Sequence, residues 1–309
     1  MNDTLDKGLV TFFDEVKYDG IFDDASVTIA QQAWTAGVPT ASGSMTFTAT
    51  QVIPARVEYF DTFIPSALRV GRYKDTMKKG IWNDVSDEFT KEILDGLVAG
   101  KISADAESKF WNAATSATQT AVAGLTPGTG QGSAGAAEQS YVASLTASQF
   151  DGVVTRMIYN AGGVGGRVKV AGTTITSSNI AAQYALAYAA VPALNLSDSS
   201  NQPVIYAPKS HRQLINLANL NLTNYIKAFD VTGGNYSYQD LKIEFVPLPE
   251  NCIIIAKPSD IHWCTDSTDD ITQMNIMPTL PFSKTWGYQV CFTEFAHVTH
   301  QSMNVLYLG

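Results

Sequence analysis

The sequence predicts an α+β fold, in which strands and helices occupy largely separate parts of the chain. Residues 241–248 alternate apolar with polar side chains, which is typical of a half-buried strand. After Pro249, the run Cys252–Ala256 is apolar, mostly β-branched and bounded by turn residues, which predicts a strand buried on both faces. By contrast, apolar residues between 82 and 97 recur every three or four positions, which predicts a helix.

Length and composition limit the class of protein. A chain of 309 residues is long enough for about two domains. Charged residues make up 16% of the chain, against about 25% in a typical globular protein. Such a surface suits a protein that covers its exterior with copies of itself, and it also suits many secreted β-proteins. The net charge of −9 argues against a dedicated nucleic-acid-binding protein, which would need a basic face.

Nothing in the sequence indicates export or a membrane partner. The first residues, MNDTLDKGLVTFFDEV, lack the basic start and apolar core of a signal peptide. No window reaches the roughly 18 apolar residues of a membrane-spanning helix. Cys252, Cys264 and Cys291 are an odd number of cysteines without CxxC spacing, which predicts buried, reduced thiols in a cytosolic protein.

The first 43 residues predict an arm rather than a domain. Their aromatic residues follow no regular period, so the segment cannot bury itself against its own turns. It must lie on another surface, which is either the body of its own chain or a neighbouring chain, and the pattern leaves both open.

Residues 44–72 predict a two-stranded ribbon. Alternation of apolar residues with threonine begins at Met45, and after a turn at Pro54 it resumes with Val57. A lone two-stranded ribbon is marginally stable in water, so this one needs a surface to lie on. If that surface belongs to a neighbouring chain, replacing Met45–Ile64 by a short linker is expected to leave the subunit folded.

Residues 73–123 predict two helices. The first carries the apolar stripe over 82–97 and ends at Gly100. The second begins at Ser103, a residue suited to the N-cap, and carries Phe110 on its apolar side. Aromatic residues at helical spacing are far more often core than cofactor pocket, so both helices are interpreted as core.

The rest of the chain predicts a mixture of elements joined by short turns. The Gly- and Ala-rich segment 126–137 is typical of a flexible connector or surface loop. The predicted helices cover about 146–158, 179–191 and 210–217. The predicted strands cover 167–170, 204–206, 272–277, 288–300 and 304–308.

No arrangement of residues predicts catalysis, a metal or a cofactor. The glycines of 126–137 and of 162–166 lack the phosphate-loop and dinucleotide-binding patterns and their context. His297 and His300 are three residues apart on a predicted strand and so point to opposite faces. The acidic cluster Asp266–Asp270 lacks the spacing and the glycine of a calcium loop.

This order of elements resembles that of tailed-phage major capsid proteins, whose Johnson fold (also called the Hong Kong 97 fold) is shared with encapsulins. The resemblance is carried by the strand, proline turn, buried strand and acidic exit over 241–270, and by the helix, short strand, proline and capped helix before them. It implies an N-terminal arm, an extended β-ribbon loop, a spine helix, a peripheral domain and an apical domain. The implied boundaries are 1–43 for the arm, 44–72 for the loop, 73–145 with 270–300 for the peripheral domain, and 146–269 with 301–309 for the apical domain.

The resemblance implies a structural function, in which many copies assemble into the hexamers and pentamers of an icosahedral shell around the genome of a tailed phage. Such a shell encloses double-stranded DNA without sequence-specific binding, so it needs no basic face. The further implied partners are portal, scaffolding and decoration proteins, with assembly in the host cytoplasm and a final location in the virion capsid. The alternatives are an encapsulin-type compartment shell, a secreted surface or binding protein and, third, an enzyme. The candidate inter-subunit contacts are Phe12, Phe13, Phe22, Phe47, Arg56, Glu58, Tyr59 and Phe60.

Overall fold

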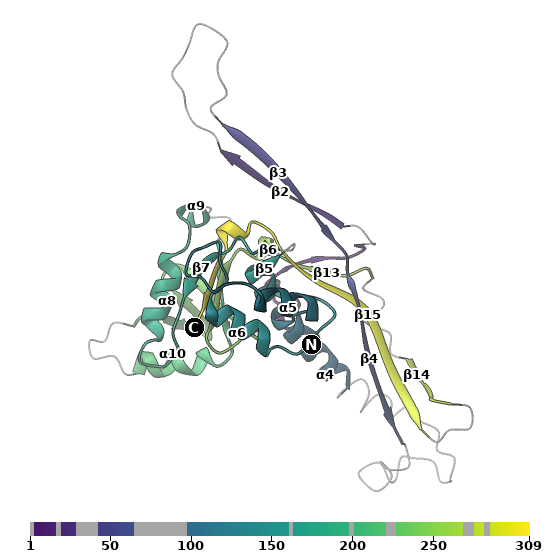
Figure 1. Ribbon diagram of the computed structural model, residues 1–309. Helices are drawn as coiled ribbons and strands as arrows, with labels where there is room; N and C mark the ends of the chain where they lie inside the picture. Colours follow the sequence, from purple (N-terminus) through teal and green to yellow (C-terminus); the bar gives the residue numbers. More distant parts are fainter. Residues whose placement is uncertain are drawn as a thin grey trace, which may run out of the picture.

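The body of the molecule consists of two sheets and the helices around them, and one ribbon projects from it (Figure 1). The predicted helix over 82–97 lies outside the described residues. Within the described residues, no helix is both long and apolar enough to cross a membrane. The computed structural model describes residues 3–16, 20–28, 43–64, 98–160, 163–197, 201–220, 227–267, 275–280 and 285–309.

The larger sheet has seven strands and lies at the centre of the body. Its third strand in spatial order, β12 (Cys252–Ala256), is completely buried, as its apolar sequence predicts. Ile253 and Ile255 belong to one hydrophobic core and Ile254 to another, so this strand is buried on both faces. In spatial order the strands are β7 (Val168–Ala171), β16 (Val305–Leu308), β12, β8 (Val204–Pro208), β11 (Leu241–Val246), β10 (Asn235–Tyr238) and β9 (Asp230–Thr232).

Helices cover both faces of the larger sheet. On one face, α8 (Ile180–Ala189) and α10 (His211–Leu220) complete the core that contains Ile253. On the other face, α4 (Ala99–Asn112) and α7 (Val153–Ile158) contribute to the core that contains Ile254. The other helices are α1 (Asp3–Asp6), α5 (Ser116–Ala123), α6 (Ala136–Ser144) and α9 (Ala193–Leu196), with the 3-10 turns η2 (Pro258–Asp260) and η3 (Gln301–Met303).

Helix α4 contradicts the predicted helix break between Gly100 and Ser103. Both residues lie inside the helix, so Gly100 does not end one and Ser103 does not cap one. A glycine in a helix costs about 1 kcal/mol relative to alanine. The complete burial of Phe110 and Trp111, whose rings meet edge to face at 5.4 Å, outweighs that cost.

The smaller sheet is organised along one long strand, β15 (Trp286–Val298). Its first residues pair with β14 (Asn275–Pro278), and its last residues pair with β13 (Ile261–Cys264), which in turn pairs with β1 (Thr11–Phe13). Strand β4 (Ala55–Phe63) pairs with β15 on the edge opposite β14. The predicted boundaries instead put β13 in the apical domain and β4 in the extended loop, and the division into domains stays a prediction. A separate short pair is formed by β5 (Tyr159–Asn160) and β6 (Gly163–Val164).

The projecting ribbon consists of β2 (Gly20–Thr28) and β3 (Ser44–Val52), which are antiparallel (Figure 1). The predicted hairpin between the two runs around Pro54 is therefore wrong. Both runs are strands, but the second is β4, whose Val57 is buried in the body. Alternation determines the face to which side chains point and leaves the neighbouring strand open. Replacing Met45–Ile64 would remove a strand of the body, so this pairing conflicts with the expectation that the subunit stays folded.

Candidate functional site

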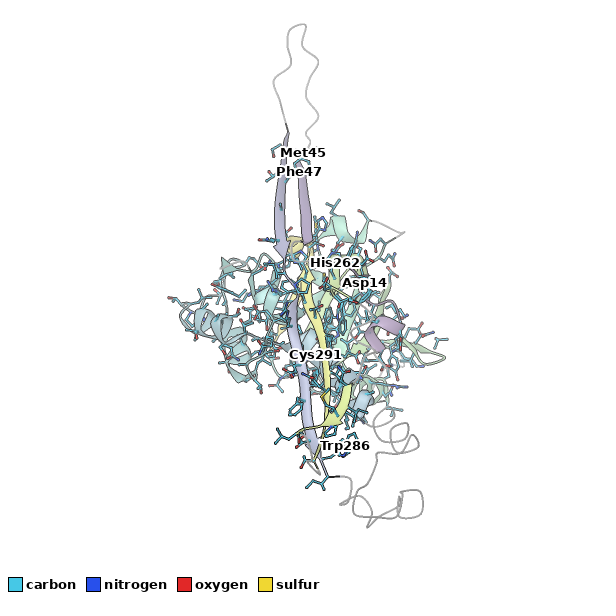
Figure 2. The ribbon with its side chains drawn as sticks, turned by 90° about the vertical axis from the view of Figure 1, so that its right-hand side faces the viewer. Asp14, Met45, Phe47, His262, Trp286 and Cys291 are labelled. Carbon is cyan, nitrogen blue, oxygen red and sulfur yellow. The ribbon has the colours of Figure 1, made fainter. Side chains whose placement is uncertain are left out.

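The ribbon carries large apolar side chains that its own subunit does not cover. Met45 is 60% exposed and Phe47 is 66% exposed. Ser44 and Thr46, on the opposite face of β3, are exposed as well. Figure 2 shows Met45 and Phe47 on the part of the ribbon that extends beyond the body. Phe22 belongs to the paired strand β2. This half of β3 therefore lacks a burial partner on either face within the described residues.

The base of the ribbon, in contrast, is anchored in the body. Val52, the last residue of β3, is completely buried. It forms a small core with Val16, Cys264 and Phe295, which come from the amino-terminal segment, β13 and β15. The anchor positions the ribbon without covering its outer half.

A second exposed surface is formed by one face of β4, β15 and β14. Residues paired across strands share a face, so the exposed side chains of the three strands lie side by side. Phe60 is 58% exposed, and its ring extends over β15 at Gly287, where an added Cβ atom would lie 3.0 Å from the ring. Gln289 donates a hydrogen bond of 2.7 Å from Nε2 to Oε1 of Glu58. We call this surface the outer sheet face, and its residues are Arg56, Glu58, Phe60, Met277, Gln289 and Cys291.

Three of the predicted contact residues thus lie on the outer sheet face, whereas Tyr59 points to the opposite face of β4. The Tyr59 hydroxyl donates a hydrogen bond of 2.7 Å to Asp105 on α4, and its ring stacks on Phe292 with centroids 6.0 Å apart. Burial and the Asp105 carboxylate raise the pKa of Tyr59. Tyr59 therefore packs mainly within its own subunit.

The amino-terminal arm also finds a surface on its own chain. Leu9 and Val10 are buried, and β1 adds a strand to the smaller sheet. Phe12 packs against the core that contains Ile254. The Phe13 ring meets the His262 ring edge to face, with centroids 5.0 Å apart. Of the two surfaces left open by the sequence, these residues use the body of their own subunit. A contact of Phe12 or Phe13 with a neighbour stays a prediction.

The cysteines differ from the prediction at one position. Cys252 and Cys264 are buried, and burial raises the pKa of the Cys264 thiol to about 12. Cys291 lies exposed on the outer sheet face, beside Glu58, so the prediction of a buried thiol is wrong there. Because the pairing of β15 with β4 was missed, the surface that they share was not predicted.

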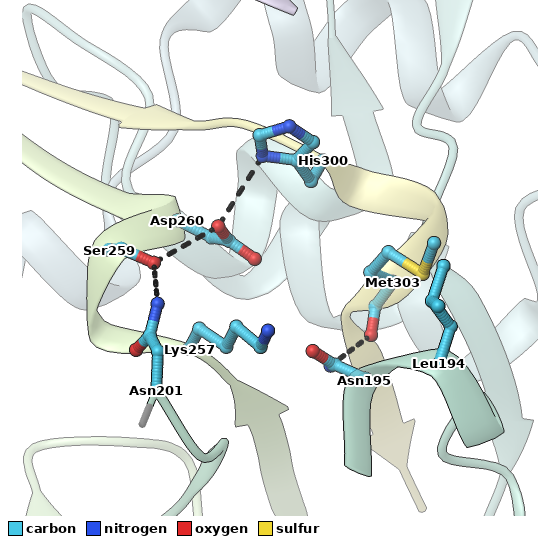
Figure 3. Close-up of a pocket in the computed structure, with 8 residues that line it drawn as sticks. All are labelled: Leu194, Asn195, Asn201, Lys257, Ser259, Asp260, His300 and Met303. Atoms are coloured by element: carbon cyan, nitrogen blue, oxygen red, sulfur yellow. Dashed lines mark hydrogen bonds and ion pairs between the residues drawn. The ribbon is translucent and has the colours of Figure 1, made fainter. Parts of the chain in front are cut away.

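A cavity of about 300 Å³ near the end of β15 contains polar side chains but not a catalytic triad (Figure 3). One oxygen of Asp260 lies 3.4 Å from the Ser259 hydroxyl and 3.4 Å from Nδ1 of His300. In a triad the imidazole lies between the serine and the carboxylate and accepts the serine proton. Here the carboxylate lies between the other two groups, so His300 cannot activate Ser259.

The histidines of the smaller sheet do not make a metal site in the described part of the chain. His300 lies beyond the end of β15, and His297 instead faces His262, with ring centroids 6.0 Å apart. Burial lowers the pKa of His297 to about 3 and that of His262 to about 4, so both rings are neutral near pH 7. Among the described residues, no group of three or more His, Cys, Asp or Glu side chains is placed to hold a metal. The acidic cluster continues beyond Asp266 into residues outside the described ranges.

Glu294 is a buried carboxyl group that should make the folded protein less stable as the pH rises. It lies in β15 with no exposed surface, and neither carboxylate oxygen has a hydrogen-bond partner among the residues that the structure describes. Burial raises its pKa well above the usual value. The folded state therefore retains this proton at pH values where the unfolded state has lost it. The contribution of the protonated carboxyl to the free energy of unfolding is fully present below about pH 4.3 and is lost as the pH rises toward the folded pKa.

We expect Glu294→Gln to raise the free energy of unfolding by about 1–3 kcal/mol at pH 8 and by less at pH 5. Urea titrations of both proteins at the two pH values measure the difference. Glu58→Gln, on the outer sheet face, is the matched control and should change little. An equal effect of Glu294→Gln at both pH values would contradict the assignment of a protonated carboxyl.

Comparison with known proteins identifies the fold. No family model and no curated protein sequence matches the chain, whereas many solved structures do. The capsid of an empty GTA particle matches with a TM-score of 0.58 and 8% identity, covering 98% of this chain and 94% of that chain. A chain of the satellite phage P4 procapsid matches with a TM-score of 0.51 and 11% identity, covering 99% and 96%. Microbacterium phage Oxtober96 matches with a TM-score of 0.53 and 8% identity, covering 99% and 90%.

These matches span nearly the whole chain and come from a phage procapsid, the capsid of a GTA particle and a further phage. The chain therefore has the fold of phage capsid proteins, which confirms the Johnson fold and the α+β class predicted from the sequence. At such low identity the likeness establishes the fold, and function has to be argued from the exposed surfaces.

Proposed function

We propose that this chain is the major capsid subunit of a tailed bacteriophage and that it assembles with copies of itself into an icosahedral shell. The observation that carries the proposal is the outer half of β3, which is exposed on both faces and bears Met45 and Phe47. An uncovered ribbon with large apolar side chains is stable and soluble only when another surface covers it. The capsid fold makes a second copy of the chain the natural provider of that surface.

The mechanism is repeated association rather than chemistry. Each interface buries apolar area from the ribbon and from residues such as Phe60 and Met277, at about 25 cal/mol per Å². One such contact is weak, but closure of the shell multiplies it over every subunit. The subunit has no catalytic role in this proposal.

The proposal includes the partners and domains implied by the resemblance. The proposed domains are the peripheral domain, 73–145 with 270–300, and the apical domain, 146–269 with 301–309. The pairing of β4 and β13 with β15 supports counting these two strands with the peripheral domain. The partners are other copies in hexamers and pentamers, portal, scaffolding and decoration proteins, and enclosed double-stranded DNA. Assembly takes place in the host cytoplasm, and the final location is the virion capsid. The encapsulin alternative is not favoured, because the similar structures described above are phage and GTA capsids.

Sedimentation and negative-stain microscopy of the purified protein test the proposal. We expect capsomers or uniform closed shells under assembly conditions. Alkylation of Cys291, which is exposed in the subunit, should become slower in the shells if the outer sheet face is covered there. Alkylation of the denatured protein is the control, in which all three thiols should react. A protein that stays monomeric at high concentration, across a range of salt and crowding conditions, would contradict the proposal.

A further inference from the structure

A cavity at the edge of the larger sheet collects positive charge in a chain that is acidic as a whole. The cavity has a volume of about 370 Å³ and lies where β10 and β11 meet α10. Three cationic side chains line it from three separate parts of the fold: Lys7 follows α1, Arg212 lies in α10 and Lys242 lies in β11. The chain has a net charge of −9, so this concentration of cations runs against its overall composition.

The negative charge at the cavity does not balance these three cations. Glu244 is the one acidic residue among the described lining residues, and its side chain is 11% exposed. It lies 2.6 Å from the Lys242 ammonium group and 3.8 Å from that of Lys7. One carboxylate shared by two ammonium groups leaves a formal excess of two positive charges when Arg212 is included.

Arg212 is held at the cavity, and its terminal nitrogens donate no hydrogen bond within the described part of the chain. Its Nε donates a hydrogen bond of 3.3 Å to the Tyr236 hydroxyl, and its guanidinium lies 5.7 Å from the centre of that ring. The Tyr236 hydroxyl in turn donates to Oδ1 of Asn216 at 3.3 Å. No carboxylate within the described residues pairs with Arg212. Arg212 also lowers the pKa of Tyr236, chiefly through this hydrogen bond.

We propose that this cavity, lined by Lys7, Arg212 and Lys242, binds phosphate groups. A guanidinium with free terminal nitrogens presents paired donors that match two phosphate oxygens, and flanking ammonium groups add charge. An excess of two positive charges balances the charge of one phosphate dianion or of two phosphodiesters. The cavity is open beside the exposed Gly234, so the phosphate can belong to a larger molecule such as the backbone of a nucleic acid.

The phosphate site does not depend on the proposed shell function. Only one source of the phosphate, an enclosed double-stranded DNA, rests on that function, whereas free inorganic phosphate does not. Titration with inorganic phosphate and titration with a random-sequence duplex of about 20 base pairs therefore distinguish the two sources.

The experiment uses the full-length protein at a concentration below that at which particles sediment. Phosphate binding is followed by calorimetry and duplex binding by fluorescence anisotropy at several salt concentrations. We expect Arg212→Gln to weaken binding of phosphate about tenfold or more, which is the loss of one charge-assisted hydrogen bond. If the duplex binds at the same site, Arg212→Gln should also reduce the slope of log affinity against log salt concentration by about one, which corresponds to one released counterion.

Arg212→Lys keeps the charge and should retain more of the affinity than Arg212→Gln does. Lys101→Gln, an exposed change of the same charge on α4, is the control and should bind as the unchanged protein does. Arg212 is exposed, so its replacement should not unfold the protein. Binding of phosphate alone assigns the site to a free anion, and binding of both ligands assigns it to nucleic acid as well. The proposal is wrong if the unchanged protein binds neither ligand, or if Arg212→Gln and Lys101→Gln have the same effect.

Discussion

Replacing residues 22–50 by a short Gly/Ser linker is expected to leave the subunit folded and to abolish shell assembly. The replaced residues comprise most of β2 and β3, which pair with each other as a separate two-stranded sheet. Val52, which anchors the base of the ribbon, is retained. The cost of closing a loop grows slowly with its length, so the linker itself should be tolerated. Assembly should fail because the apolar contact of the ribbon is lost at every interface.

Circular dichroism and thermal unfolding measure the fold of this variant, while sedimentation measures assembly. A second variant, Met45→Ser with Phe47→Ser, keeps the ribbon and removes only its large apolar side chains. It should weaken assembly without changing the unfolding transition. A contrasting control replaces residues 44–63. This change also removes β4 with its buried Val57, so the variant should not fold. Shells formed by the 22–50 variant would show that the ribbon is not an inter-subunit contact.

The sequence predicted where the strands lie along the chain better than it predicted which strands pair with one another. The apolar run Cys252–Ala256 and the closing run Val305–Leu308 are buried strands of the larger sheet, as their composition indicates. Local composition suffices there, because only a strand covered on both faces is apolar throughout. For β3 and β4 the alternation indicated the exposed faces, but their pairing with β2 and β15 depends on residues far away in the sequence.

For the candidate surfaces, too, the sequence indicated single residues but not which strands lie side by side. Of the candidate contacts on β4, Arg56, Glu58 and Phe60 lie together on its exposed face, whereas Tyr59 points to the opposite face. Their neighbour Cys291 could not be placed beside them without the pairing of β4 with β15. Nor did the sequence indicate a buried ion pair between the helix at the end of the Gly-rich segment 126–137 and a residue 29 positions further along the chain, just before a strand. Such a pair leaves no periodic pattern, because it involves one residue on each element.

That ion pair joins Glu138 of α6 to Arg167, which directly precedes β7. Both side chains are almost completely buried, with exposed fractions of 3% and 0%. The Arg167 guanidinium donates to Oε1 of Glu138 from both Nε and a terminal nitrogen. The same guanidinium donates to the backbone carbonyls of Gly165 at 3.1 Å and Ser133 at 3.3 Å. The other carboxylate oxygen of Glu138 accepts a hydrogen bond of 2.7 Å from the backbone of Gly135, so the pair orders the Gly-rich segment that the sequence predicts to be flexible.

Glu138→Ala is expected to lower the free energy of unfolding by about 3–5 kcal/mol, because it leaves the buried Arg167 charge without a partner. Arg167→Met should cost less, because the Glu138 carboxylate keeps the Lys169 ammonium at 3.8 Å and the backbone N–H of Gly135. Combining Arg167→Met with Glu138→Ala should cost less than the sum of the two single changes, since neither Arg167 nor Glu138 is then left without the other. The loss of Glu138 also removes the partner of the buried Lys169 ammonium, which lies 3.8 Å from that carboxylate, so some cost remains in the double variant. Urea unfolding of the four proteins measures the coupling, with Glu250→Ala on the surface as a control that should stay within about 0.5 kcal/mol. If the effects of the two single changes are simply additive, Glu138 and Arg167 do not act as a pair, and the order of the Gly-rich segment has another cause.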